Sequence, residues 1–129
     1  MAADAQTIQS AVDRYTSCFS AGDRERFLEC FAEGAWIEDP VGTPRREGRR
    51  SIGEFFDQTQ GMAESVELRR TGPVRVADGE AAFPMQARPL IDGTTYCVHI
   101  IDVMTFDDDG AITTVRAFWD PAAMAPAED

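Results

Sequence analysis

The sequence has no long hydrophobic run and few basic residues. No apolar run approaches the ~20 residues that a membrane-spanning helix needs, so we expect no membrane partner. Segment 1–10 is polar and lacks the apolar core of a secretory signal, which favours a cytoplasmic location. Only 12 Lys and Arg stand against 23 Asp and Glu, giving a net charge of −11. This balance argues against nucleic acid, whose phosphates require clustered basic residues, and favours a small, neutral, apolar ligand.

Cysteine is also scarce. The three cysteines, Cys18, Cys30 and Cys97, are odd in number and widely spaced. A chain of 129 residues can bury a core without cross-links, so this pattern argues against a disulfide framework and indicates a reduced compartment. The basic residues come closest together at residues 45–50, a turn-rich stretch that we interpret as a solvated face.

The chain length fits a single domain over residues 1–129, and the N-terminal third of that domain is expected to be helical. The first helix begins after the N-cap Asp4, ends before Gly22 and carries an apolar stripe at helical spacing: Ile8, Val12, Tyr15 and Phe19. The second helix is capped by Asp23, ends at Gly34 and buries Phe27, Leu28 and Phe31. A third helix is expected over residues 51–60, with three inward side chains: Ile52, Phe55 and Phe56.

The remaining segments predict strands. Residues 35–39 form a short strand that places Ala35, Ile37 and Asp39 on one face and ends at Pro40. Three Asp-Gly pairs, typical of hairpin turns, separate further strands over about residues 66–77, 80–91, 94–107 and 111–119. Pro89 indicates an edge or a bulge in its strand, because proline cannot donate a ladder hydrogen bond. Residues 122–129 are expected to be loose.

Helices followed by an antiparallel meander predict an α+β fold. We expect a cone-shaped roll in which three helices pack on a curved antiparallel sheet, with a pocket between the two layers. The strand expected over residues 94–107 is apolar on both faces, one shared with Asp102 and the other with His99. A second copy of the chain would cover the outer face, so we expect a homodimer through the sheet and interpret His99 as an interface residue.

Asp102 is an acid in the middle of this apolar strand. An ionised carboxylate buried without partners costs several kcal/mol. Keeping it protonated at pH 7 costs roughly 4 kcal/mol from its ordinary pKa of about 3.9. The two costs are comparable, so a dry site can hold a neutral acid that donates a hydrogen bond. The alternative is that Asp102 pairs with Arg116 or caps a backbone group.

Two further residues are candidates for chemistry. Asp39 shares a face with Ile37 and precedes Pro40, so it has few backbone donors nearby and is a candidate general base. The alternative is an Asp-Pro turn. Tyr15 lies on the buried stripe of the first helix and needs a partner for its hydroxyl, although a core tyrosine bonded to the backbone would satisfy the same pattern.

Several short runs together resemble the steroid Δ5-isomerase (ketosteroid isomerase) family, within the NTF2-like and SnoaL-like superfamily. The resemblance extends from about residue 10 to residue 120. The run 101–104, Ile-Asp-Val-Met, is its most specific part when taken with Tyr15, whereas the Glu-Asp-Pro of residues 38–40 recurs widely in the superfamily. The other matching runs are Arg14-Tyr15, Gly22-Asp23, residues 37–42, residues 71–75, residues 82–84 and residues 117–119.

The resemblance implies an isomerase that converts 3-oxo-Δ5-steroids to the Δ4 isomers. Asp39 matches the base that carries the proton from C4 to C6. Tyr15 and a protonated Asp102 match the two donors to the dienolate oxygen. One carboxylate removes and returns the proton, so the implied reaction needs no metal and no organic cofactor. We expect six side chains to contact the steroid: Trp119, Met85, Phe83, Met104, Ile100 and Phe56.

The sequence departs from this family at the positions around the tyrosine. Phe31 and Phe56 stand where some members carry further tyrosines that bond to the catalytic hydroxyl, and Met85 stands where an aromatic residue is expected. Two other functions stay open. One is a polyketide cyclase or epoxide hydrolase of the same fold, although no polar cluster beside Asp39 or Asp102 indicates a bound water. The other is a domain that only binds a small molecule.

Overall fold

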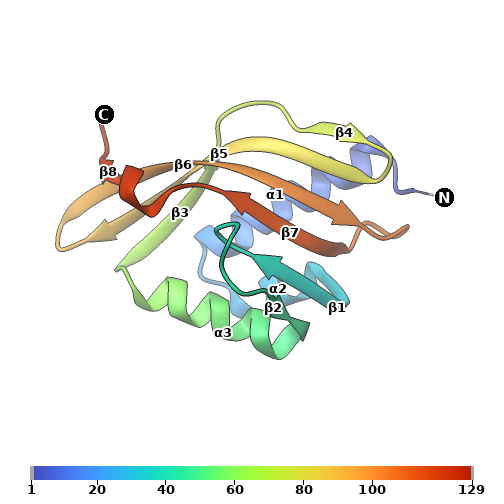
Figure 1. Ribbon diagram of the computed structural model, residues 1–129, viewed down its shortest axis with the longest axis horizontal. Coiled ribbons are helices and arrows are strands. Elements are labelled where there is room, and N and C mark those ends of the chain that lie inside the picture. The colour runs from blue at the N-terminus through green and yellow to red at the C-terminus, as the bar shows by residue number, and fades with distance from the viewer. Residues whose placement is uncertain (1, 129) are drawn as a thin grey trace.

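A computed structural model describes residues 2–128 of the chain (Figure 1). Its helices are α1 (Ala5–Ser20), α2 (Arg24–Glu29) and α3 (Gly48–Gly61). Its long strands are β1 (Phe31–Glu38), β3 (Ser65–Arg70), β5 (Glu80–Ile91), β6 (Thr94–Phe106) and β7 (Ile112–Phe118). The short elements are β2 (Arg46–Glu47), β4 (Arg75–Ala77), the 3-10 helix η1 (Pro121–Ala123) and β8 (Ala125–Pro126).

The three predicted helices are present, and local capping explains where α1 and α2 begin. The Asp4 carboxylate accepts a hydrogen bond from the backbone N–H of Thr7 at 2.8 Å and so caps α1. Asp23 caps α2 in the same way. The expected stop at Gly22 is also present: this residue adopts φ +69°, and its N–H bonds to the carbonyl of Phe19.

The helices meet in an aromatic core. Phe27 has ring contacts with Tyr15, Phe19, Phe31 and Phe56 at centroid separations of 5.0 to 5.5 Å. These rings come from α1, α2, the start of β1 and α3, so a single cluster joins all three helices to the sheet. Such aromatic contacts add to the stability that comes from area burial. The cluster also positions the ring of Tyr15, which packs against Phe27 and Phe31.

The strands form one curved, mixed sheet in the order β2-β1-β7-β6-β5-β3, which arches over the helices (Figure 1). The predicted meander is confirmed, since β3–β5, β5–β6 and β6–β7 are all antiparallel pairs. Asp78-Gly79 and Asp92-Gly93 close hairpins with positive φ at both residues, as a type I′ turn requires. The prediction of a wholly antiparallel sheet is wrong, because β1 pairs with β7 in parallel.

Two predicted boundaries are wrong: the end of the second helix at Gly34 and the continuous strand over residues 66–77. Gly34 does not end the second helix, which stops at Glu29; it lies inside β1 at φ +78°, where the pairing with β7 shifts register. The strand expected over residues 66–77 is split into β3 and β4. Gly72 lies between them so close to Pro84 that a Cβ atom would come within 2.8 Å of that ring.

Pro89 and the C-terminal tail differ from the predictions as well. Pro89 is not on an edge strand, since β5 lies between β3 and β6; the ladder to β6 skips this position. The tail is not loose where it is described. Residues 125 and 126 pair with β6, and the N–H of Ala127 bonds to the carbonyl of Thr95 at 2.8 Å. Asp129 lies outside the described residues.

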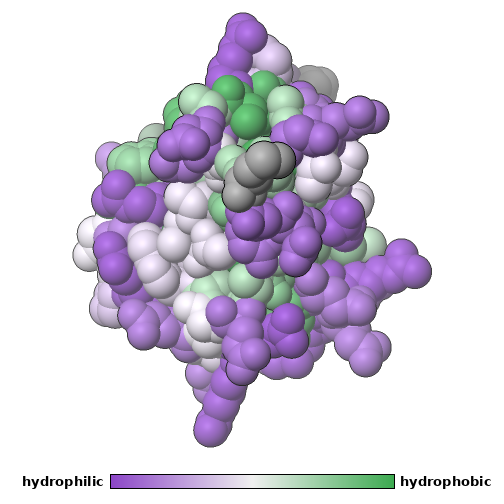
Figure 2. Space-filling model, turned by 90° about the vertical axis from the view of Figure 1, so that its right-hand side faces the viewer, coloured by the Kyte–Doolittle hydropathy of each residue, from purple (hydrophilic) through white to green (hydrophobic). Residues whose placement is uncertain are grey.

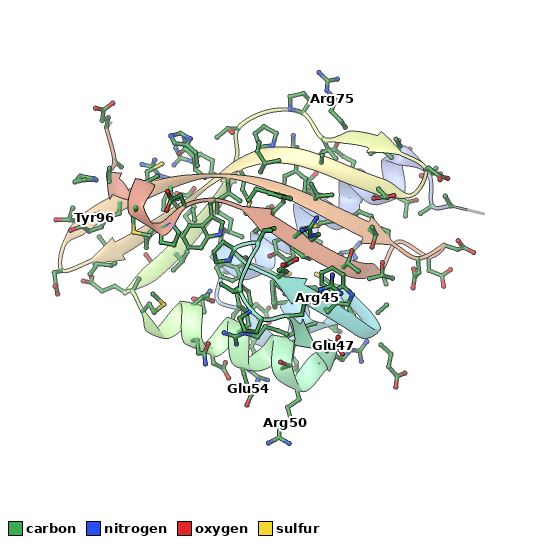
Figure 3. All side chains as sticks on the ribbon, viewed as in Figure 1. Arg45, Glu47, Arg50, Glu54, Arg75 and Tyr96 are labelled. Atoms are coloured by element: carbon green, nitrogen blue, oxygen red, sulfur yellow. The ribbon has the colours of Figure 1, made fainter. Side chains whose placement is uncertain are left out.

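The resulting architecture is the predicted α+β cone, with helices on one side of a curved sheet that does not close. The side chains of Arg50 and Glu54 project from α3 away from the sheet, while Phe55 and Phe56 are buried under it (Figure 3). None of the helices in residues 2–128 is both long and apolar enough to cross a membrane.

Candidate active site

A cavity of about 320 Å³ opens between the helices and the sheet. Side chains from α1, α3, β3, β5 and β6 line it, together with residues that follow β1 and β7. Most of this lining is apolar. Its size and character match those of sites that bind small apolar molecules. Among the lining residues Tyr15 and Asp39 are the groups with acid–base chemistry that the sequence indicated.

Asp39 owes its position to the parallel pairing of β1 with β7. In this pair Ile37 lies opposite Val115, so the segments that follow both strands emerge side by side. Asp39 follows one strand and Trp119 follows the other. The indole Nε1–H of Trp119 donates to Oδ1 of Asp39 at 2.6 Å. Trp119 therefore does more than form a cavity wall: it holds one oxygen of the candidate base.

Three effects set the pKa of Asp39. Burial is the largest and raises the pKa above its ordinary value, because it disfavours the charged form. The hydrogen bond from Trp119 and the positive charge of Arg46 both lower it. The carboxylate is thus more basic than an exposed aspartate while two groups still favour its ionised form, which suits a general base.

Tyr15 lies on the buried stripe of α1 and is 2% exposed. Its ring packs against Phe27 and against Phe31, at centroid distances of 5.2 and 6.2 Å. Burial, followed by the charges of Asp102 and Asp39, raises the pKa of its phenol well above the ordinary value. The hydroxyl thus stays protonated and remains a hydrogen-bond donor. Phe31 supplies a ring but no hydroxyl to support it.

Asp102 lies on β6 between Phe83 of β5 and Ala117 of β7, and is 1% exposed. Neither of its carboxyl oxygens has a hydrogen-bond partner among the described residues. The alternative partner Arg116 lies on the other face of the sheet, where its Nε is 3.0 Å from a carboxylate oxygen of Glu38. Pairing of Asp102 with Arg116 is therefore wrong.

The surroundings of Asp102 favour its neutral form. Burial, and then the negative charge of Asp39, raise the pKa of Asp102 well above its ordinary value. The neutral acid is a donor that the described part of the protein leaves unused. Asp102 is not among the residues that line the cavity, but its ionised form would raise the pKa of Tyr15, and the charge of Asp39 raises the pKa of Asp102 itself. The structure thus brings the three predicted residues into one electrostatic group.

The residues expected to contact a steroid divide into two sets. Trp119, Met85 and Ile100 line the cavity. Phe83, Met104 and Phe56 do not; they are at most 4% exposed and belong to the hydrophobic core behind the cavity wall. Side-chain alternation along a strand, like residue spacing along a helix, predicts which face a side chain lies on. It does not predict whether the side chain reaches the cavity or stays in the core, so it does not separate these two sets.

The prediction that residues 45–50 form a solvated face is wrong for Arg46. Its side chain lines the cavity, and its Nη2 donates to Oε1 of Gln58 at 2.8 Å. Arg45, in contrast, is exposed and lies over the ring of Trp36 (Figure 3). Met62 and Met124 also line the cavity without a signal in the sequence. Gln58 and Thr59 line it as well, at positions i+3 and i+4 from Phe55; this helical spacing is the signal that could have found them.

His99 is exposed on the outer face of β6, on the other side of the sheet from Asp102, as the alternation of side chains along a strand predicts. In residues 2–128 there is no group of three or more His, Cys, Asp or Glu side chains that is arranged to hold a metal ion. The acid–base candidates of the site are thus the Asp39 carboxyl and the Tyr15 phenol, which line the apolar cavity, and the Asp102 carboxyl, which is buried outside its lining.

Comparisons with known proteins identify the family of this chain. A family model described as a SnoaL-like domain matches residues 12–115. The chain is 39% identical to the steroid Delta-isomerase of Nocardioides simplex over 117 residues, which cover 91% of this chain and 93% of that protein. It also resembles the solved structure of the epoxide hydrolase/cyclase-like enzyme SalBIII, which has a role in pyran ring formation in the polyether salinomycin.

The similarity to SalBIII has a TM-score of 0.86 at 28% sequence identity, and covers 96% of this chain and 98% of that one. Both relatives are enzymes, and both match almost the whole chain. The match to the isomerase at 39% identity includes the segments that carry Tyr15, Asp39 and Asp102 within its 117 residues. The chain therefore belongs to the steroid Δ-isomerase family, within the SnoaL-like superfamily.

Proposed function

We propose that this protein isomerises 3-oxo-Δ5-steroids to 3-oxo-Δ4-steroids, with Asp39 as the base and Tyr15 and Asp102 as donors to the oxyanion. The observation that carries the proposal is Asp102, a fully buried acid whose two oxygens have no partner among the described residues. A protein that needed only a stable core would gain from an apolar side chain there, because an unsatisfied buried polar group costs free energy. The relative from Nocardioides simplex supports the same activity.

The proposed reaction moves one proton and no other atom. The carboxylate of Asp39 takes a proton from C4, and the electrons of the C4–H bond move toward O3 to give a dienolate. The proton then goes from Asp39 to C6, and the C5–C6 double bond becomes a C4–C5 double bond. Trp119 holds Oδ1 of Asp39, which leaves Oδ2 to face the steroid carbons.

The barrier lies in the formation of the dienolate, since the proton on C4 is only weakly acidic. A preorganised donor aimed at a developing oxyanion is worth about 3–4 kcal/mol. A positioned base contributes roughly 10²–10⁴-fold in rate. Tyr15 and neutral Asp102 are two such donors, and both work in an apolar setting where hydrogen bonds to an anion are strong.

The test is the turnover of 5-androstene-3,17-dione, followed by the absorbance of the conjugated enone that forms. We expect Asp39→Asn to lose nearly all activity, because an amide cannot accept the proton. Asp78→Asn is a matched control, since Asp78 lies in a hairpin turn at φ 47° and asparagine tolerates this backbone conformation. Unchanged turnover in Asp39→Asn would contradict the proposal.

A second candidate function comes from the similarity to SalBIII. An epoxide hydrolase or cyclase of this fold would use Asp39 to activate a water or a hydroxyl group. The same cavity would then convert an epoxide or a β-keto ester and leave steroid enones unchanged. Activity on such substrates with no turnover of the Δ5-ketone would favour this function over the isomerase.

The proposal includes a homodimer through the outer face of the sheet. Ile101 and Phe118 are directly opposite each other in the β6–β7 pair, and they are 46% and 42% exposed. Exposed large apolar side chains that adjoin on a sheet often mark an interface. Light scattering at micromolar concentration tests this, and a monomer there would contradict the dimer.

A further inference from the structure

The cavity of the candidate active site has two unlike ends. Tyr15 lines it and is 2% exposed, so this residue marks the inner end. Met62 also lines it and is 73% exposed, so this residue stands at the mouth. Burial of an apolar side chain of this size is favourable, because it removes apolar surface from water. Within residues 2–128 the other exposed large apolar side chains, Ile101 and Phe118, are less open to solvent and lie on the outer face of the sheet, away from the cavity.

Three segments distant in sequence frame this mouth. Met62 is the C-cap of α3, Ile91 is the last residue of β5, and Met124 lies between η1 and β8. The elements that carry them lie together at the left of Figure 1. The pairing of β8 with β6 holds the tail in place, so Met124 is a fixed part of the mouth. Methionine side chains are flexible and adapt to irregular apolar partners.

The polar side chains along the α3 wall are already used within the protein. Gln58 accepts a hydrogen bond from Arg46 through Oε1, and the Thr59 hydroxyl donates to backbone carbonyls of α3 at 3.0 Å. The mouth itself adds only apolar side chains. By contrast, the opposite end of the molecule is mostly hydrophilic, with apolar side chains in small patches (Figure 2).

We infer that the mouth binds a hydrocarbon chain at the end of the ligand remote from its ketone. This inference rests on the proposed function and narrows its substrate class: the preferred substrates are 3-oxo-Δ5-steroids with an apolar side chain on ring D. A chain of this kind covers Met62 and Met124 and removes apolar surface from water. A carboxylate at the same place is disfavoured by the net charge of −11, and Arg46, a basic residue of the cavity lining, already donates to Gln58.

Equilibrium binding of three 3-oxo-Δ4-steroids, which the proposed reaction does not consume, tests this directly. The first carries a saturated hydrocarbon chain at C17, the second is androst-4-ene-3,17-dione, and the third carries a chain that ends in a carboxylate. Trp119 lines the cavity, so quenching of tryptophan emission reports binding. We expect the hydrocarbon ligand to bind most tightly and the carboxylate to bind most weakly.

Substitution at the mouth then links the preference to a residue. Met62→Gln keeps the length of the side chain but removes its apolar character. We expect this substitution to reduce the ratio of hydrocarbon-ligand affinity to dione affinity about tenfold, because the hydrocarbon ligand loses its contact with one well-covered apolar side chain. Glu64→Gln introduces the same side chain two residues further along, on an exposed residue that does not line the cavity, and should leave the ratio as it is in the unmodified protein.

Equal or weaker binding of the hydrocarbon ligand overturns the inference, as does a ratio that Met62→Gln does not change. Turnover of 5-androstene-3,17-dione is measured in parallel to separate the two proposals. If the dione is isomerised but the chain brings no preference, only the inference about the mouth fails. If the preference and its dependence on Met62 are present without any turnover, the mouth binds apolar chains and the isomerase function fails.

Discussion

Replacing Asp102 by asparagine should change how the stability of the folded protein depends on pH. In the folded chain burial and the charge of Asp39 raise the pKa of Asp102 well above its ordinary value. In the unfolded chain the same carboxyl has its ordinary pKa of about 3.9. The folded state therefore holds a proton that the unfolded state releases over the pH range between these two values.

The sign of the effect follows from this difference in bound protons. A group whose pKa is raised by folding contributes its full stability below the unfolded pKa, and that contribution is lost as the pH rises toward the folded pKa. While the folded acid stays protonated, the loss is about 1.36 kcal/mol per pH unit, hence about 2.7 kcal/mol between pH 5 and pH 7. Because Asp102 is 1% exposed, little screening by solvent reduces this figure.

Asparagine does not titrate, so Asp102→Asn should become more stable relative to the unmodified protein by about 2.7 kcal/mol between these two pH values. Urea unfolding at pH 5 and pH 7, at one fixed protein concentration, measures the change. A poor fit of the amide would lower the free energy of unfolding by the same amount at both pH values, so it does not affect the comparison. Asp102→Leu should show the same pH dependence, although its absolute stability differs. Stability curves that stay parallel from pH 5 to pH 7 would refute the idea that Asp102 is neutral.

Three substitutions around the cavity give further predictions for turnover. Tyr15→Phe removes one donor and should lower kcat by about 10²–10³-fold, as steady-state kinetics would show; a fold-change below about 10 would exclude Tyr15 from the oxyanion site. Trp119→Phe removes the hydrogen bond that lowers the pKa of Asp39, so the acidic limb of kcat/KM should move to higher pH, whereas Trp36→Phe should leave it in place. Arg46→Met should move the same limb in the same direction, and Arg46→Lys should restore it; an unmoved limb would contradict the electrostatic role of Arg46.

Much of this site could be predicted from local patterns. Helical spacing placed Tyr15 on a buried stripe, and strand alternation placed Asp102 on an inward face opposite His99. Both patterns depend only on the geometry of one element, so they are readable from a single sequence. The turns at residues 78–79 and 92–93 could be predicted for the same reason, because positive φ at both positions is a local requirement; at residues 109–110 only the glycine has positive φ.

What the sequence did not reveal depends on pairing between distant segments. The hydrogen bond between Trp119 and Asp39 joins residues 80 positions apart, and it follows from the parallel pairing of β1 with β7. Alternation says nothing about which strand is the neighbour. Gly34 shows the local form of the same limit: a glycine at positive φ fits a helix end and a β-bulge equally well, and only the register of β1 decides between them.

The two acids of the site show why these long-range contacts matter for the chemistry. Both are buried enough that burial is the largest influence on the pKa and raises it. Asp39 then gains a hydrogen bond from Trp119 and the charge of Arg46, which favour its carboxylate, whereas Asp102 gains only the repulsion of Asp39, which favours its neutral acid. Two residues of the same type thus have opposite preferences, one for the ionised form and one for the neutral form. The parallel pairing of β1 with β7 brings the Trp119 indole to Asp39, whereas no described residue donates a hydrogen bond to Asp102.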